Sequence, residues 1–329
     1  MKVAIIGDPK RTEKYAPDLL IVKESEKHFF KLNDSVNKII SEAGYADVLL
    51  ADAIAKVPAE LINKMPNLKM IHSEGVAFNG IDVEAATKNK IYVANCKGMN
   101  ASAVAEQTIL LMLGLLRDVV DGNNAVLSGR QMNVKNQKII DGITDLSDCR
   151  VGLIGFGDIA KATADRLHSF GSQVYYWNHN RRSVEVEKRH HVTYLELDSL
   201  LKTCDIISLH VAVTPETEKM VDTDFLLKMK SNAYLINTAR GDLIDNIALK
   251  NALEKGLIAG AGLDTISPEP VTQDNPLLNL NLPSGVKILY SPHLGGITTG
   301  SFKRGYKMMW ENVARIVEGK VPNHLVNNF

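Results

Sequence analysis

The chain has 329 residues, of which 45% are hydrophobic and 23% are charged, so it is long enough for two globular domains of ordinary size. Its 38 basic and 38 acidic side chains cancel, which argues against a nucleic-acid or membrane partner held by bulk charge. No Cys-x-x-Cys pair occurs among Cys96, Cys149 and Cys204, which argues against structural zinc and favours the reducing cytoplasm.

Short apolar runs alternate with longer amphipathic ones through the first hundred residues. Strands are predicted at Val3–Ile6, Asp47–Leu50, Leu68–Ser73 and Ile91–Asn95, and helices at Phe30–Ala43, Ala59–Met65 and Val83–Lys88. This alternation is typical of a parallel sheet covered by helices, an α/β fold.

A long helix is predicted from Ser102 to Arg117, and the polar, weakly periodic segment Asp121–Leu146 is interpreted as a connection or partner-contact region. A second alternating set begins at Arg150. Its predicted strands are Val151–Ile154, Val174–Trp177, His191–Tyr194, Asp205–His210, Tyr234–Asn237, Ala259–Leu263 and Lys287–Tyr290, and a final helix covers about Phe302–Glu318.

A glycine-rich turn follows the strand that ends at Ile154 and opens a helix. Gly155 permits a tight turn, Gly157 lets the backbone approach a pyrophosphate, and Ala160 replaces the third glycine of the usual pattern. The segment therefore predicts a dinucleotide-binding loop, with a purely structural turn as the alternative.

The end of the next strand bears on the choice of dinucleotide. An acidic residue there usually binds the ribose 2′-hydroxyl, but this chain has Asn178, followed by His179, Asn180, Arg181 and Arg182. Asparagine does not repel a 2′-phosphate and two guanidinium groups can bind one, which favours NADP(H). A solvated basic turn, with Asn178 holding the 2′-hydroxyl of NAD(H), is the alternative.

Three residues in later loops are candidates for catalysis. Arg240 follows a buried strand, where its planar guanidinium suits a carboxylate. Glu269 lies between two prolines, and His293 lies in a loop rich in proline and glycine, where a histidine is suited to general acid–base chemistry. The alternatives are a surface ion pair for Arg240 and a structural role for His293.

Together these segments resemble the D-isomer-specific 2-hydroxyacid dehydrogenase family, and within it most closely the glyoxylate/hydroxypyruvate reductases. Further similarity lies in Glu74–Asp82, which resembles the family's substrate loop, in Asn100–Glu106, and in Val211–Thr217, which resembles its adenine-side loop.

The resemblance implies two Rossmann-like or flavodoxin-like domains with parallel sheets. Residues 1–100 and 291–329 would form a discontinuous substrate domain, with a dinucleotide-binding Rossmann domain, residues 101–290, inserted into it. It also implies a homodimer through the inserted domain.

The resemblance assigns the site residues. Arg240, Glu269 and His293 would be catalytic, and Gly75, Val76, Arg240 and His293 would bind substrate; no metal is expected. The residues expected to bind the cofactor are Gly155, Phe156, Gly157, Asp158, Ile159, Asn178, His179, Arg181, Arg182, Val211, Ala212, Thr217, Thr238, Ala239, Arg240, Asp264, His293 and Gly295.

The implied reaction interconverts a small 2-oxoacid and a D-2-hydroxyacid. Family members acting on 3-phosphoglycerate carry basic residues where this chain has Asp52 and Ser73, with Glu74 beside the latter, and formate dehydrogenases typically have glutamine in place of Glu269. Glyoxylate or hydroxypyruvate reduction with NADPH is therefore favoured. Lactate-type, bulkier 2-oxoacid and 3-phosphoglycerate enzymes stay as alternatives, as does a dinucleotide-sensing corepressor-like binding module.

Overall fold

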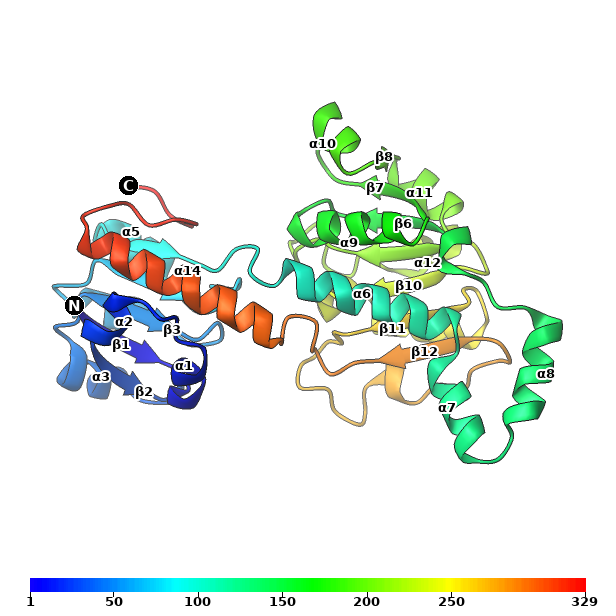
Figure 1. The fold of residues 1–329 in the computed structure, drawn as a ribbon, viewed down its shortest axis with the longest axis horizontal. Helices are drawn as coiled ribbons and strands as arrows, with labels where there is room; N and C mark the ends of the chain where they lie inside the picture. The colour runs from blue at the N-terminus through cyan, green and yellow to red at the C-terminus, as the bar shows by residue number, and fades with distance from the viewer. The chain divides into compact units, whose positions relative to one another are not determined.

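A computed structural model describes all 329 residues, which divide into two compact units. Unit 1 comprises Met1–Asn100 and Ile297–Phe329, and unit 2 comprises Ala101–Gly296. Each unit is built on a single sheet of parallel strands (Figure 1), so the α/β class with two Rossmann-like units is confirmed. No helix combines the length and apolar character needed to cross a bilayer.

Unit 1 has a five-stranded sheet in the order β2-β1-β3-β4-β5. Its strands are β1 (Lys2–Ile6), β2 (Glu26–Phe30), β3 (Val48–Ala51), β4 (Met70–Ser73) and β5 (Tyr92–Ala94). Its helices are α1 (Pro9–Tyr15), α2 (Leu20–Glu24), α3 (Val36–Ala43), α4 (Ala59–Asn63), α5 (Val83–Lys88) and α14 (Thr299–Val317).

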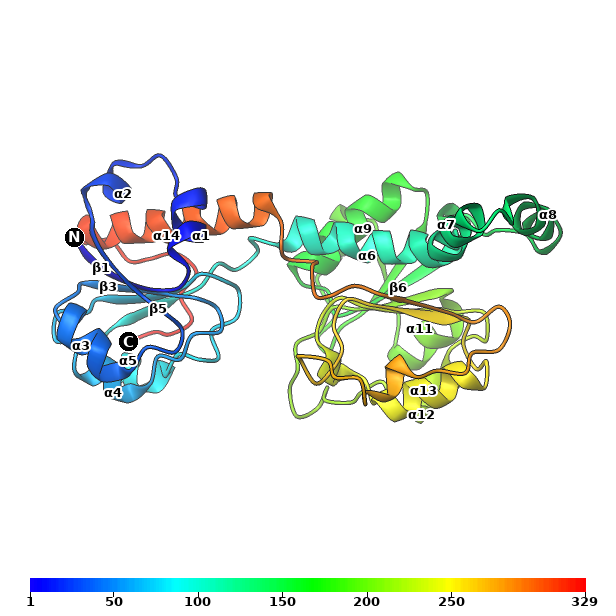
Figure 2. The same ribbon diagram turned by 90° about the horizontal axis from the view of Figure 1, so that it is seen from below.

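Side chains that alternate along these strands supply two cores. Ala4, Leu49 and Ile71 pack with residues from α3, α4 and α5 on one face. Val3, Leu50 and Met70 pack on the other face with Tyr306, Met309, Trp310 and Val313 of α14. Figure 2 shows α14 with α1 and α2 on one side of the sheet, and α3, α4 and α5 on the other. The C-terminal helix is therefore an essential layer of the N-terminal unit.

Unit 2 has a seven-stranded sheet in the order β12-β11-β10-β9-β6-β7-β8. Its strands are β6 (Arg150–Ile154), β7 (Gln173–Trp177), β8 (Thr193–Tyr194), β9 (Ile206–Leu209), β10 (Tyr234–Asn237), β11 (Gly260–Leu263) and β12 (Lys287–Tyr290). Its α-helices are α6 (Ala101–Leu116), α7 (Val119–Leu127), α8 (Gln131–Asp141), α9 (Asp158–Ser169), α10 (Val184–Arg189), α11 (Leu197–Thr203), α12 (Thr223–Lys228) and α13 (Asn246–Glu254). Short 3₁₀ turns cover Leu146–Asp148, Gly241–Leu243 and Pro276–Leu278.

The structure differs from the expected elements in three places. The helix predicted from Phe30 begins at Val36, because Phe30 ends β2, whose polar, partly exposed sequence gave no strand signal. The segment interpreted as a connection or partner-contact region contains two helices that were not predicted, α7 and α8. Helix α8 has no buried residue, so it lacks the apolar stripe that would mark a packed helix.

The boundary expected at residue 291 lies instead after Gly296. The N–H groups of Leu294 and Gly295 donate to the Asp264 carboxylate at 3.0 and 2.8 Å, which fastens this loop to unit 2.

A buried histidine links the sheet of unit 1 to α14. His72 on β4 donates from Nδ1 to the Ser73 carbonyl at 2.8 Å, and its Nε2 accepts from Asn312 Nδ2 at 3.0 Å. The Asn312 side chain also bonds with Asn323 of the C-terminal segment. Burial lowers the pKa of His72 to about 4, so the ring is neutral at physiological pH.

We predict that this histidine makes unit 1 sensitive to mild acid. Between about pH 6.5 and about pH 4, the unfolded chain binds a proton at residue 72 that the folded chain does not bind, so the free energy of unfolding should fall as the pH falls. His72→Gln should lower that slope by up to about 1.4 kcal/mol per pH unit in urea unfolding experiments. His28→Gln, at the exposed sheet edge, is the control; equal slopes in wild type and His72→Gln would contradict the prediction.

Candidate active site

The glycine-rich turn lies between β6 and α9, where the chain order of the unit 2 sheet reverses. Gly155 has φ +91°, and a Cβ there would lie 2.6 Å from the carbonyl oxygen of His210, so both conformation and space require glycine. Gly157 caps α9 without a side chain, and a Cβ there would meet nothing within 4 Å. Free helix N–H groups beside open space fit the pyrophosphate of a dinucleotide.

The turn after β7 touches the glycine-rich turn through Asn178 and Arg182. Asn178 Oδ1 accepts from the N–H of Phe156 at 3.1 Å, while its Nδ2 donates to the carbonyl of Asn180. Arg182 Nε donates to the Phe156 carbonyl at 3.2 Å, and the Arg182 side chain is exposed. Arg182 is therefore the basic residue that lies against the expected cofactor loop.

Arg181 forms an ion pair with Glu187 and makes no hydrogen bond to the glycine-rich turn. Its Nε and Nη2 donate to the two carboxylate oxygens of Glu187 at 2.8 and 2.9 Å, and its guanidinium lies over the ring of Tyr194. Tyr176 also donates to Glu187, at 2.8 Å. Sequence reasoning missed Glu187, although an acid in the helix after a basic turn is the signal that could have found it.

Arg240, Glu269 and His293 follow β10, β11 and β12, which are adjacent strands, so all three lie at the carboxyl edge of one sheet. Arg240 is exposed, and its Nη1 donates to the carbonyl of Ala239 at 2.7 Å. The next residue must be glycine, because a Cβ at Gly241 would lie 2.1 Å from the backbone nitrogen of Ser267.

Glu269 and His293 form the central pair. Both carboxylate oxygens of Glu269 lie 2.9 Å from Nδ1 of His293. A carboxylate on Nδ1 fixes the tautomer with the proton on that nitrogen and leaves Nε2 as the group that can exchange a proton. Both side chains are nearly half exposed, at 43% for His293 and 45% for Glu269, so a ligand can reach them.

The buried residue Asp264 holds the histidine loop in place. Its carbonyl accepts from the N–H of His293 at 2.8 Å, and its carboxylate accepts from the N–H groups of Leu294 and Gly295. A Cβ at residue 295 would lie 2.8 Å from that carboxylate, so glycine is needed there. Asp264, which was expected to bind the cofactor, therefore also holds the loop that carries His293.

Other expected cofactor residues also have internal partners. Thr238 Oγ1 bonds with Thr108 Oγ1 of α6 at 2.8 Å, so this side chain is turned into unit 2. Thr217 Oγ1 donates to the carbonyl of Ala212 at 2.7 Å, which folds the loop that begins at Val211.

In unit 1, the loop after β4 carries Gly75 and Val76. The N–H of Gly75 donates to Ser73 Oγ at 3.2 Å, and the carbonyl of Gly75 accepts from the N–H of Cys96. The carbonyl of Val76 accepts from Asn95 Nδ2 at 2.8 Å, while its own N–H has no partner within the protein. Of the two expected donors for a substrate carboxylate, only Val76 is therefore free.

Comparisons with known proteins show which family this chain is similar to. The family model for the D-isomer specific 2-hydroxyacid dehydrogenase, NAD binding domain, matches residues 109–295. A glyoxylate reductase of Thermofilum pendens is 36% identical over 281 residues, covering 85% of this chain and 81% of the relative. A glyoxylate reductase of Korarchaeum cryptofilum is 34% identical over 289 residues, covering 88% and 85%.

A solved structure shows the same fold over the whole chain. The D-isomer specific 2-hydroxyacid dehydrogenase of Lactobacillus delbrueckii ssp. bulgaricus, in its NAD-complexed form, superposes with a TM-score of 0.82 at 26% identity, covering 99% of this chain and 100% of that one. The protein therefore belongs to the D-isomer specific 2-hydroxyacid dehydrogenase family and is an NAD(P)-dependent oxidoreductase.

Proposed function

We propose that this protein reduces glyoxylate or hydroxypyruvate, or a similarly small 2-oxoacid, to the D-2-hydroxyacid with NADPH as the preferred cofactor. The observation that carries the proposal is the Glu269–His293 pair, in which Nδ1 is held by a carboxylate and Nε2 is left for substrate. The glyoxylate reductases among its relatives support the substrate class.

In the proposed reaction, His293 donates its Nε2 proton to the ketone oxygen. Glu269 stabilises the imidazolium that must be present before this transfer. Arg240 binds the substrate carboxylate and stabilises negative charge that develops on the oxygen. In unit 1, the N–H of Val76 is available as a donor for a carboxylate. The nicotinamide dinucleotide, when bound, supplies the hydride.

Initial rates with NADPH and NADH test the substrate class directly. Across glyoxylate, hydroxypyruvate, pyruvate, 2-oxoisocaproate and phenylpyruvate, we expect NADPH and the small acids to give the highest kcat/KM. His293→Ala should lower kcat by roughly 10²–10⁴-fold, because the proton donor is lost, while dinucleotide binding persists. His324→Ala, an exposed histidine in unit 1, is the control.

Two outcomes would count against the proposal. Near-normal turnover by His293→Ala would remove the histidine from the mechanism. Dinucleotide binding without turnover of any acid would favour the corepressor-like alternative, and preference for a bulky acid would favour the other dehydrogenase subclasses.

The NADPH preference rests on the turn that follows Asn178. Asn178 leaves no acid at the 2′ position of the ribose, and Arg182 lies against the carbonyl of Phe156 with its side chain exposed. We expect Arg182 to be the principal ligand of the 2′-phosphate, because Arg181 already has Glu187 as its partner.

Replacement of both arginines by alanine should therefore raise the KM for NADPH by roughly 10–100-fold, since charge-assisted hydrogen bonds to phosphate are lost. The KM for NADH should change little. Arg182→Ala alone should account for most of this effect, and Arg189→Ala, on the neighbouring helix, is the matched control. Equal changes for both dinucleotides would refute the assignment.

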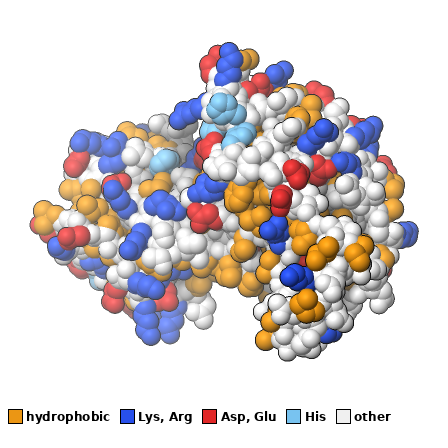
Figure 3. All heavy atoms as spheres, turned by 45° about the vertical axis from the view of Figure 1, so that its right-hand side comes forward, with side chains coloured by type: hydrophobic (Ala, Val, Ile, Leu, Met, Phe, Trp, Pro, Cys, Tyr) orange, Lys and Arg blue, Asp and Glu red, His pale blue; other side chains and the backbone are white.

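We also infer that the protein is a cytoplasmic homodimer that associates through unit 2. Exposed apolar side chains concentrate along the α7–α8 segment, next to Leu110 of α6, and hydrophobic atoms are visible on this side of unit 2 in the space-filling view (Figure 3). They include Leu110, Val119, Val120, Val126, Leu127, Met132, Ile139, Ile140 and Ile143. A patch of this kind in a water-soluble enzyme marks an interface, and the three buried free thiols support a reducing compartment.

Sedimentation at micromolar concentration should show a dimer for the wild type. Leu127→Glu, at a side chain that is 79% exposed, should shift the protein toward monomer because the charge would have to be buried at the interface. Leu20→Glu, at a 68% exposed site in unit 1, should remain dimeric. A monomeric wild type would overturn the inference.

A further inference from the structure

A buried tyrosine connects the turn after β7 to the rest of unit 2. Tyr176 lies on β7, and its side chain is fully buried. Its hydroxyl donates to Oε1 of Glu187 on α10 at 2.8 Å and accepts from the N–H of Arg182 at 3.0 Å. These residues lie at the end of the sheet where β7 pairs with β8 (Figure 1). None of the roles assigned above uses this hydroxyl.

The core of unit 2 does not need a hydroxyl at this position. The ring of Tyr176 packs against the rings of Phe156 and Tyr194, with centroids 4.5 and 5.5 Å away, and a phenylalanine ring could make the same contacts. A buried hydroxyl costs free energy unless it has hydrogen-bond partners. The two partners here are a carboxylate and the backbone of one residue in the turn after β7. The role of the hydroxyl therefore lies in that turn.

Glu187 determines which way the hydroxyl points. Two nitrogens of Arg181 donate to the Glu187 carboxylate, and this pairing lowers the pKa of Glu187, so the carboxylate is ionised at neutral pH. Burial raises the pKa of Tyr176 to about 12, so the phenol keeps its proton. An ionised carboxylate can only accept hydrogen bonds. The phenol proton therefore points at Glu187, and the phenol oxygen is left to accept from Arg182.

This contact restrains the backbone of the turn formed by residues 179–183. Among the N–H groups of these residues, only that of Arg182 donates to another group of the protein. The Arg182 side chain is held at a second point, because its Nε donates to the Phe156 carbonyl at 3.2 Å. Phe156 lies between the two glycines of the glycine-rich turn and packs against the ring of Tyr176. Tyr176 therefore contacts both the backbone of Arg182 and the residue that holds its side chain.

The far end of the Arg182 side chain stays free. Its Nη1 and Nη2 form no hydrogen bond or ion pair within the protein, and the side chain is exposed. A guanidinium binds a phosphate through two parallel N–H donors of this kind. A long side chain that is restrained before binding also loses less conformational entropy when the ligand arrives.

We propose that Tyr176 is a positioning residue for cofactor selection, whose hydroxyl fixes the backbone of Arg182 so that Nη1 and Nη2 are available to the 2′-phosphate of NADPH. This proposal rests on the proposed preference for NADPH and names the residue that holds the phosphate ligand in place. Without the hydroxyl, the N–H of Arg182 loses its only partner, and the turn has to be ordered when the cofactor binds.

The binding of NADPH and NADH, which differ only by the 2′-phosphate, tests the proposal without turnover. Fluorescence titration of the wild type should give a lower Kd for NADPH than for NADH. Tyr176→Phe keeps the ring and removes the hydroxyl, so it should reduce the ratio of the two affinities by roughly three- to tenfold. The Kd for NADH should stay at its wild-type value. An equal loss of affinity for both dinucleotides would overturn the proposal, because it would indicate a general structural effect.

The neighbouring residue on the same strand provides a matched control. Tyr175 donates from its hydroxyl to Gln173 at 3.2 Å, outside the turn that carries Arg182. Tyr175→Phe makes the same chemical change one residue away, and both Kd values should stay at those of the wild type. A loss of NADPH preference in this variant equal to that in Tyr176→Phe would count against a specific role for Tyr176.

Amide hydrogen exchange in the free wild-type protein gives a second measurement that needs no variant. The N–H of Arg182 should exchange more slowly than those of Asn180 and Arg181, which have no partner within the protein. Equal exchange rates for the three amides would overturn the proposal. This measurement decides the question if Tyr176→Phe does not fold.

The outcomes separate this proposal from the one on which it rests. A wild type that binds NADPH and NADH equally would overturn the NADPH preference and the role of Tyr176 with it. A preference for NADPH that is lost in Arg182→Ala but kept in Tyr176→Phe would overturn only the role of Tyr176.

Discussion

The carboxylate of Asp264 is the interaction on which the catalytic half of the protein depends. Asp264 directly follows β11. Its carboxylate accepts hydrogen bonds from two successive N–H groups of the loop after β12, and its backbone carbonyl accepts from the N–H of His293. Three hydrogen bonds to a buried residue leave the loop little freedom. Because Glu269 comes from the loop after β11 and His293 from the loop after β12, this attachment brings base and acid to hydrogen-bonding distance.

Contacts within the protein also fix the glycine-rich turn. Gly155 leaves no space for a Cβ beside the carbonyl of His210, and the Asn178 side chain accepts from the N–H of Phe156, so the turns after β6, β7 and β9 lie in direct contact. The loop is thus shaped by protein contacts before any dinucleotide arrives. Preorganisation of this kind reduces the ordering cost that binding must overcome.

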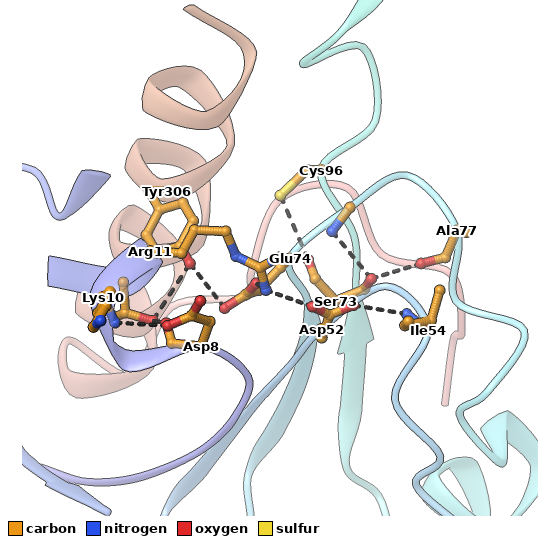
Figure 4. Close-up of polar contacts among 12 residues, drawn as sticks. Asp8, Lys10, Arg11, Asp52, Ile54, Ser73, Glu74, Ala77, Cys96 and Tyr306 are labelled. Atoms are coloured by element: carbon orange, nitrogen blue, oxygen red, sulfur yellow. Dashed lines mark hydrogen bonds and ion pairs between the residues drawn. The ribbon is translucent and has the colours of Figure 1, made fainter. Parts of the chain in front are cut away.

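Much of the fold could be read from the sequence because apolar runs and glycines report local geometry. The strands that lead to Gly155, Arg240 and His293 lie where their buried patterns predicted them. The edge strand β2 and the exposed helix α8 could not be predicted, because β2 has one fully buried residue and α8 has none, which is too little to impose a hydrophobic pattern. Ion-pair partners could not be predicted from the sequence. Arg181 was expected to bind a phosphate, but in the structure it pairs with Glu187. Asp52 and Glu74 are two acidic residues in the sequence, and in the structure both pair with Arg11 (Figure 4).

The place of α14 has a consequence for how the protein is made. The five strands of unit 1 leave the ribosome first, yet the helix that covers Val3, Leu50 and Met70 is encoded after the whole of unit 2. Unit 2 is continuous and can complete its core as soon as β12 emerges, whereas the first sheet waits with one apolar face uncovered. The N-terminal unit is therefore the last to mature, and this interval is when the nascent chain is most exposed to aggregation and most in need of chaperones.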